Sequence, residues 1–157
     1  MSANSSTIIL IGEKILLSIW VGGMWVIGYL VAPFLFSKLS ETALAGYLVG
    51  ELIKTISLVG VVVLVSILIR LVWQLKTSSF RHWLFWCVSV ALGLLLLNIL
   101  LLYPEMAALK IAGIENGTER TEQFNRLHGA SAMSYLLVSI AGLFMISNGL
   151  RSEPDSI

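Results

Sequence analysis

The chain has 157 residues, of which 57% are apolar and only 12% are charged, whereas soluble domains are about one quarter charged. A formal net charge of +1 offers no basic surface for nucleic acid, and the single cysteine, Cys87, excludes an intramolecular disulfide and a multi-cysteine metal site. This composition predicts an integral membrane protein surrounded by a lipid bilayer.

The first two predicted spans are long apolar segments of the N-terminal half. A transmembrane helix needs about 20 apolar residues, and residues 15–36 supply them without a charge. Pro33 is expected to stop or bend this helix near its far end. The second span is predicted at residues 52–73, where we expect Lys54 and Arg70 to extend their charges to opposite membrane surfaces.

The third and fourth predicted spans follow a shorter polar connection. Residues 83–103 form the third, in which Asn98 is the strongly polar residue and after which Pro104 is expected to end the helix. The fourth is predicted at residues 127–150, in a helix that begins in water near Glu119. The four segments together predict an all-α fold, an integral membrane four-helix bundle.

The whole chain, residues 1–157, is therefore interpreted as a single membrane domain. Lysine and arginine are equally numerous on the two predicted sides, but they are densest in the connection that contains Arg70, Lys76 and Arg81. Because cytoplasmic loops are enriched in basic residues, we expect this loop and both termini to face the cytoplasm. The predicted location is the inner (cell) membrane of a bacterium.

Small residues predict where these helices pack closely. Glycine lets helix backbones approach one another in membranes. The expected packing positions are Gly22 and Gly23 in the first span, Gly46 and Gly50 in the second, and Gly129 in the fourth.

A polar row along the fourth span is the main candidate site. His128, Ser131 and Tyr135 are three and four residues apart, which places them on one face of a helix. Such a row is costly toward lipid, so we expect it to face the bundle. Asn98 and Glu105 share a face of the third helix on the same side of the membrane. These residues predict a polar site between helices near the non-cytoplasmic surface.

Four motifs in this order resemble a known family of small membrane proteins. The motifs are LLSIWVGGMWVIGYLVAPFLF, LAGYLVGEL, NILLLYPEM and FNRLHGASAMSYLL. They are similar to the family related to eukaryotic transmembrane protein 205, whose bacterial members contain a domain of unknown function. The resemblance extends from Leu16 to about Leu143 and implies four membrane spans, without a defined biochemical activity.

Three interpretations of the candidate site remain open. The first is a non-enzymatic accessory or interaction protein that binds a membrane-protein partner or a second copy. The second is a haem-binding or redox protein that uses His128, and the third is an oligomeric transporter of small molecules or ions. His82 and His128 are predicted on opposite surfaces, about 30 Å apart, so they cannot share one haem within a protomer.

The sequence favours the first interpretation. It contains no paired nucleophile and base, no phosphate-binding loop and no metal-ligand spacing. We therefore expect no enzymatic activity, no cofactor, no metal and no nucleic-acid partner.

Overall fold

The computed structural model describes residues 3–75, 83–111 and 119–149, and within these ranges only residues 39–41 lie outside a helix. Four helices are long and apolar enough to cross a membrane. They are Ile8–Lys38, Thr42–Trp73, Trp83–Ile111 and Glu119–Ser147. The predicted all-α, four-helix membrane fold is confirmed.

Each of these helices is longer than the span predicted for it. They contain 29 to 32 residues, which at about 1.5 Å per residue gives about 45 Å. The hydrocarbon core of a bilayer is only about 30 Å thick. The helices must therefore tilt or extend beyond the hydrocarbon core.

Pro33 does not end the first helix. The chain runs without interruption through α1 (Ala3–Trp25), a π-helical segment η1 (Val26–Val31) and α2 (Ala32–Lys38). Proline lacks an N–H group, and its ring collides with the carbonyl four residues earlier. The π turn just before α2 shifts the backbone hydrogen bonds by one residue. Pro33 is the second residue of α2.

Pro104 is accommodated in the same way. The third helix continues from α4 (Trp83–Leu97) through the π-helical segment η3 (Asn98–Leu102) into α5 (Tyr103–Ile111). Pro104 is the second residue of α5, as Pro33 is of α2. The expectation that Pro104 closes the helix is therefore wrong, because the π turn before it lets the helix continue.

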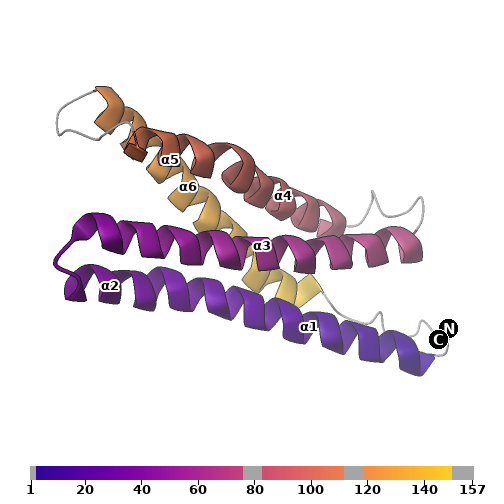
Figure 1. Cartoon of the computed structure of the whole chain (residues 1–157). Helices are drawn as coiled ribbons and strands as arrows, with labels where there is room; N and C mark the ends of the chain where they lie inside the picture. The colour runs from indigo at the N-terminus through magenta and orange to yellow at the C-terminus, as the bar shows by residue number, and fades with distance from the viewer. Residues whose placement is uncertain (1–2, 76–82, 112–118, 150–157) are drawn as a thin grey trace.

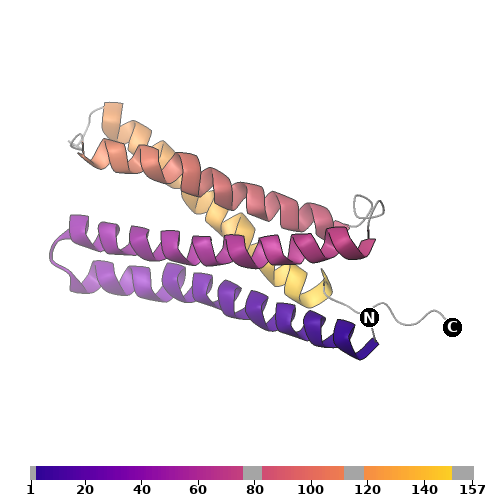
Figure 2. The same ribbon diagram turned by 45° about the vertical axis from the view of Figure 1, so that its right-hand side comes forward.

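The four long helices form a closed ring of contacts. The second helix, α3 (Thr42–Leu75), packs against α1 and α4, and the fourth, α6 (Glu119–Phe144), packs against α4 and α1. A short π-helical segment, η4 (Met145–Gly149), ends the described part of the fourth helix. α1 and α2 run alongside α3, while α6 crosses the bundle obliquely (Figure 1). Figure 2 shows the same crossing from a second direction.

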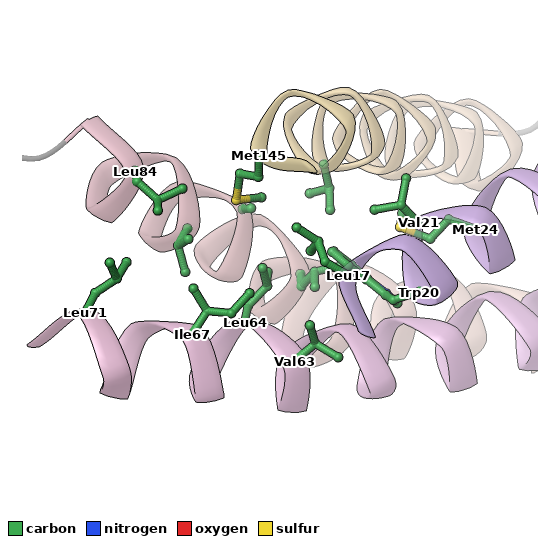
Figure 3. Packing of buried hydrophobic residues seen from close by; sticks show 14 residues of the cluster. Leu17, Trp20, Val21, Met24, Val63, Leu64, Ile67, Leu71, Leu84 and Met145 are labelled. Carbon is green, nitrogen blue, oxygen red and sulfur yellow. The ribbon is translucent and has the colours of Figure 1, made fainter. Parts of the chain in front are cut away.

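The apolar core lies where α6 crosses the other helices. Its side chains come from all four helices and include Leu17, Leu64, Val88 and Met145, each at most 1% exposed (Figure 3). Burial of these side chains from lipid gains little hydrophobic energy, so close packing must hold the helices together.

Trp20 is the largest fully buried side chain in this core. Its indole Nε1 donates a hydrogen bond of 3.0 Å to the carbonyl oxygen of Ile56 in α3. The ring lies directly on Gly60, where a Cβ atom would overlap it. Gly60 therefore provides the space that lets a tryptophan fit between α1 and α3.

A second close approach joins α1 to α6. At Gly142 a Cβ atom would overlap the side chain of Val21. Of the described glycines, Gly60 and Gly142 therefore make the closest contacts with a side chain of a neighbouring helix.

The glycines predicted to mediate packing behave differently from one another. A Cβ at Gly23 would lie 3.0 Å from Ile56 Cδ1, and one at Gly46 would lie 3.8 Å from Phe36 Cζ. Among the described residues, no heavy atom of a neighbouring helix lies within 4 Å of a Cβ built at three others: Gly22, Gly50 and Gly129. The expected close packing is not found at these three positions because they lie on exposed faces of their helices.

Replacement of Gly60 by alanine is expected to destabilise the bundle. The new methyl group must displace the indole of Trp20, which is held by its hydrogen bond to Ile56. Overpacking of this kind costs about 1–3 kcal/mol. The free energy of unfolding in detergent micelles measures the effect.

Gly50→Ala in the same helix is the matched control, because open space surrounds that position. We expect it to be neutral or stabilising, by up to about 1 kcal/mol, since alanine favours the helix over glycine. Equal stability of the two variants would contradict the packing described for Trp20.

Candidate functional site: polar contacts between the helices

Asn98 and Ser131 form the centre of a polar cluster between helices. Asn98 is 3% exposed, and Ser131 Oγ donates a hydrogen bond of 2.6 Å to Asn98 Oδ1. Asn98 Nδ2 donates to the carbonyl oxygen of Leu94 in its own helix, at 2.9 Å. The structure thus brings together two of the predicted site residues and connects the third and fourth helices through them.

Tyr135 connects the fourth helix to the first. Its hydroxyl donates a hydrogen bond of 2.8 Å to the carbonyl oxygen of Met24, shortly before the π-helical segment η1. Gly28 lies beside this ring, since a Cβ atom built at Gly28 would be 3.3 Å from Tyr135 Cε1. A π turn interrupts the regular pattern of backbone hydrogen bonds in a helix. A side-chain donor can then bond to a nearby backbone carbonyl group.

Tyr103 and Ser57 extend the cluster to the second helix. The Tyr103 hydroxyl lies on the side of its helix that faces the hydroxyls of Ser57 and Ser131. Ser57 is 1% exposed and also donates to the carbonyl oxygen of Ile53 at 2.7 Å. All four long helices therefore contribute a polar group to this cluster.

Neither Tyr103 nor Ser57 was among the residues predicted for the site. In a regular α-helix, residues five apart lie on different faces. The π turn changes this, because the backbone N–H of Tyr103 bonds to the carbonyl of Asn98, five residues earlier. Tyr103 consequently follows Asn98 on the same face, which the regular helical period does not predict.

His128 does not face the bundle. The buried face of α6 passes through Ser131, Ser134 and Val138, and toward the helix start it continues through Leu127 and Phe124, which are half-buried. His128 lies beside this face and is exposed. The predicted inward orientation of His128 is wrong for this geometric reason.

The imidazole of His128 instead packs on an aromatic ring. The rings of His128 and Phe124 are stacked, with centroids 5.9 Å apart and an interplanar angle of 10°. Lys110 Nζ of α5 lies 5.6 Å from the centroid of the same Phe124 ring. We call these three residues the α5–α6 aromatic surface. Glu105, the other predicted site residue of this region, is also exposed and stands apart from the buried cluster.

A buried ion pair joins α1 and α3 at the opposite end of the bundle. Arg70 Nε donates to Glu13 Oε1 at 2.6 Å, and the two side chains are 13% and 11% exposed. The expectation that Arg70 extends its charge to the membrane surface is therefore wrong. A carboxylate on a neighbouring helix stabilises the cation within the bundle, since an unpaired charge there is costly.

Sequence reasoning missed this pair. The two residues are 57 positions apart, and no local spacing connects them. The available signal was topological: Glu13 lies just before the first predicted span and Arg70 just inside the end of the second, and both ends belong to the same side of the membrane. Opposite charges at the same membrane depth can pair if their helices are neighbours.

A metal centre is not visible in the described parts of the chain. Within residues 3–75, 83–111 and 119–149, no three histidine, cysteine, aspartate or glutamate side chains gather as metal ligands would. His82 lies outside those ranges, so its predicted separation from His128 stays a prediction.

Fold and polar contacts together define a class of protein: an integral membrane four-helix bundle whose helices are joined by buried hydroxyl, amide and ionic contacts. Residues 15–115, more than half of the chain, match the family described as Domain of unknown function (DUF4149). The chain belongs to this family. No curated protein and no solved structure matches the chain.

The contact between Asn98 and Ser131 is expected to show measurable coupling in a double-mutant cycle. Asn98→Ala and Ser131→Ala remove the same hydrogen bond, so their effects on unfolding should not add. Buried polar contacts between membrane helices contribute about 0.6 kcal/mol on average and up to about 1.7 kcal/mol. Unfolding in detergent of the wild type, both single variants and the double variant gives the coupling energy.

Ser134 provides the matched control for this cycle. It is also buried in α6, but its hydroxyl donates to the carbonyl of Ala130 in its own helix. The effects of Ser134→Ala and Asn98→Ala should therefore be additive. Additivity in the Asn98–Ser131 cycle as well would contradict the contact.

Neutralising one partner of the buried ion pair is expected to be costly. Arg70→Gln leaves the Glu13 carboxylate buried without its guanidinium, which typically costs about 3–5 kcal/mol. Replacing both residues by glutamine should recover part of the loss. The free energies of unfolding of the single and double variants test this.

The exposed pair formed by Glu122 and Arg126 offers a comparison in the same protein. Its atoms lie 3.8 Å apart and its side chains are 73% and 84% exposed. We expect Arg126→Gln to cost no more than about 1 kcal/mol. If the two arginine variants were equally stable, the ion pair between Glu13 and Arg70 would not be buried as described.

Proposed function

We propose that this chain is a non-enzymatic membrane protein that acts by association, as an accessory or interaction protein. The supporting observation is that some of its polar groups are bonded inside the bundle, whereas others are exposed on its surface. Asn98, Ser131 and Tyr135 are engaged with other groups of the bundle, so they serve to hold the helices together. The α5–α6 aromatic surface, by contrast, presents Lys110 and His128 outward.

The position of this surface suits recognition of another protein. It lies at the end of α5 and the beginning of α6, where the charged first turns of α6 give way to an apolar helix. Aromatic and cationic side chains at such a boundary combine apolar contact area with hydrogen-bond donors. The partner is another membrane protein or a second copy of this chain.

The cellular arrangement belongs to the same proposal. The dense basic connection after the second span supports placing both termini in the cytoplasm of a bacterium, in its inner membrane. The α5–α6 aromatic surface and the polar cluster then lie toward the non-cytoplasmic side. The four sequence motifs support a relationship to the eukaryotic transmembrane protein 205 family.

Site-specific photocrosslinking tests the proposal. A photoreactive phenylalanine analogue is placed at position 128 of the full chain in its native membrane. We expect a covalent adduct of defined mass. An adduct of twice the chain mass identifies a second copy, and a different mass identifies another protein, which reciprocal crosslinking must reproduce. His128→Ala should weaken co-purification of the same partner in mild detergent.

Position 62 is the control, because Val62 is 67% exposed on α3 and lies within its apolar stretch. Crosslinking at 128 that is no stronger than at 62, with no partner after repeated purification, would contradict the proposal. The purified protein also provides an absorption spectrum. A Soret band that disappears in His128→Ala would favour the haem-binding interpretation instead.

A further inference from the structure

Lys110 carries a charge that no acidic side chain of the described residues neutralises. Its Nζ lies 5.6 Å from the centroid of the Phe124 ring, and among the described residues it forms no ion pair. Glu122, the acid nearest to Phe124 in the sequence, pairs with Arg126 at 3.8 Å. Glu105 lies five residues before Lys110, on a different face of α5. The ammonium group is therefore available to a carboxylate from outside the chain.

His128 adds a second hydrogen-bond donor beside the same ring. Its imidazole is stacked on Phe124 at an interplanar angle of 10°, so the contact uses the face of the imidazole and leaves uncovered the edge that carries the nitrogen atoms. His128 is exposed, and neither nitrogen atom forms a hydrogen bond with a described residue. A neutral imidazole has one N–H donor, and a protonated imidazole has two. One aromatic ring thus holds two donors, one of them charged, at the surface of the protein.

These groups together suit a carboxylate. An ammonium group donates a short, charge-assisted hydrogen bond to a carboxylate oxygen, and the second oxygen can accept from an imidazole N–H. The half-buried ring of Phe124 offers apolar contact to the methylene groups that carry the carboxylate.

The charge of the region favours a single acidic side chain over an anionic lipid surface. Residues 105–111 and 119–128 contain three glutamates and three lysines or arginines, so they carry no net charge. Attraction to anionic lipid headgroups is typical of clusters of about four to eight basic residues. A region without net charge does not attract such a surface, but one unpaired ammonium group still binds one carboxylate.

We propose that the α5–α6 aromatic surface binds an aspartate or glutamate side chain that the partner presents at the membrane surface. The carboxylate accepts hydrogen bonds from Lys110 Nζ and from the imidazole of His128, and its methylene groups pack on Phe124. This inference rests on the proposed association function and adds the chemistry by which the partner is recognised.

Photocrosslinking from a neighbouring position tests the proposal while the three residues of the surface stay intact. Ala132 is exposed and lies one turn after His128, so a photoreactive phenylalanine analogue is placed at position 132 of the full chain in its native membrane. We expect Lys110→Gln to lower the yield of the partner adduct about tenfold, because a charge-assisted hydrogen bond is lost. Lys110→Arg keeps the charge, and its yield should stay within about twofold of the wild type.

Lys38 provides the matched control. It is an exposed lysine at the last position of α2, on the same predicted side of the membrane but outside the α5–α6 aromatic surface. Lys38→Gln should leave the adduct yield unchanged. Because Lys110 is exposed, Lys110→Gln should elute from size exclusion in detergent as the wild type does, which separates loss of binding from loss of folding.

Charge reversal identifies the acidic group. The crosslinked peptide of the partner is sequenced, and its aspartate or glutamate within about one helical turn of the linked residue is replaced by lysine. Lys110→Glu alone should abolish the adduct, and its combination with the lysine of the partner should restore it. If the adduct has twice the chain mass, the two changes are made in two differently tagged copies of this chain.

The possible failures of this inference and of the proposed function are distinguishable. A strong wild-type adduct that Lys110→Gln leaves unchanged, or that charge reversal does not restore, would overturn this inference alone. Absence of any adduct from positions 128 and 132 of the wild type would contradict both. An adduct with a phospholipid instead of a protein, lost in Lys110→Gln, would identify a lipid phosphate as the ligand and would overturn the assignment of an acidic side chain.

Discussion

The insertion of Trp20 between α1 and α3 is the contact on which the rest of the bundle depends. A tryptophan brings a large ring and one N–H group, and in an apolar environment that group must find an acceptor. Both requirements are met on α3, by the space above Gly60 and by the carbonyl of Ile56. The position of Trp20 sets the register between the two helices. It consequently determines that Glu13, two turns earlier, meets Arg70.

The π-helical segments η1 and η3 explain how polar contacts and prolines coexist in the same helices. Each segment precedes a proline and restores backbone bonding around it. Each also lies beside a side-chain contact of the polar cluster: Tyr135 bonds to Met24 near η1, and Ser131 bonds to Asn98 at the start of η3. Backbone irregularity is tolerated inside a membrane only where other groups satisfy the freed donors and acceptors. The cluster therefore serves the fold first, and its residues are poorly available for a ligand.

Two sets of charged groups among the described residues lie in different environments and have different roles. The pair of Glu13 and Arg70 is enclosed between helices, so its contribution depends on complete pairing of the two charges. Lys110 and His128 of the α5–α6 aromatic surface are exposed at a helix end, where interactions are individually weak but accessible to a partner. The two ends of the bundle thus offer different chemistry, an enclosed ion pair at one and an aromatic cationic surface at the other.

The sequence by itself determined the class of this protein and the number of its helices. Long apolar segments are more stable in lipid than in water. In lipid they form helices, because every backbone group must then form its hydrogen bond within its own segment. The meeting of Asn98 and Ser131 was also predictable, since a polar residue on each of two membrane helices at the same depth tends to face the other.

Tertiary structure alone decided where His128, Tyr103 and the ion pair lie. His128 was assigned inward by its spacing from Ser131, but a residue three positions away is offset around the helix, and the buried face runs through Leu127 and Phe124 instead. Tyr103 entered the cluster because a π turn changed the period that such spacing assumes. The contact of Glu13 with Arg70 required α1 and α3 to be neighbours in a particular register. That register follows from the fit of Trp20 on Gly60, a matter of shape between distant segments that no local pattern of residues contains.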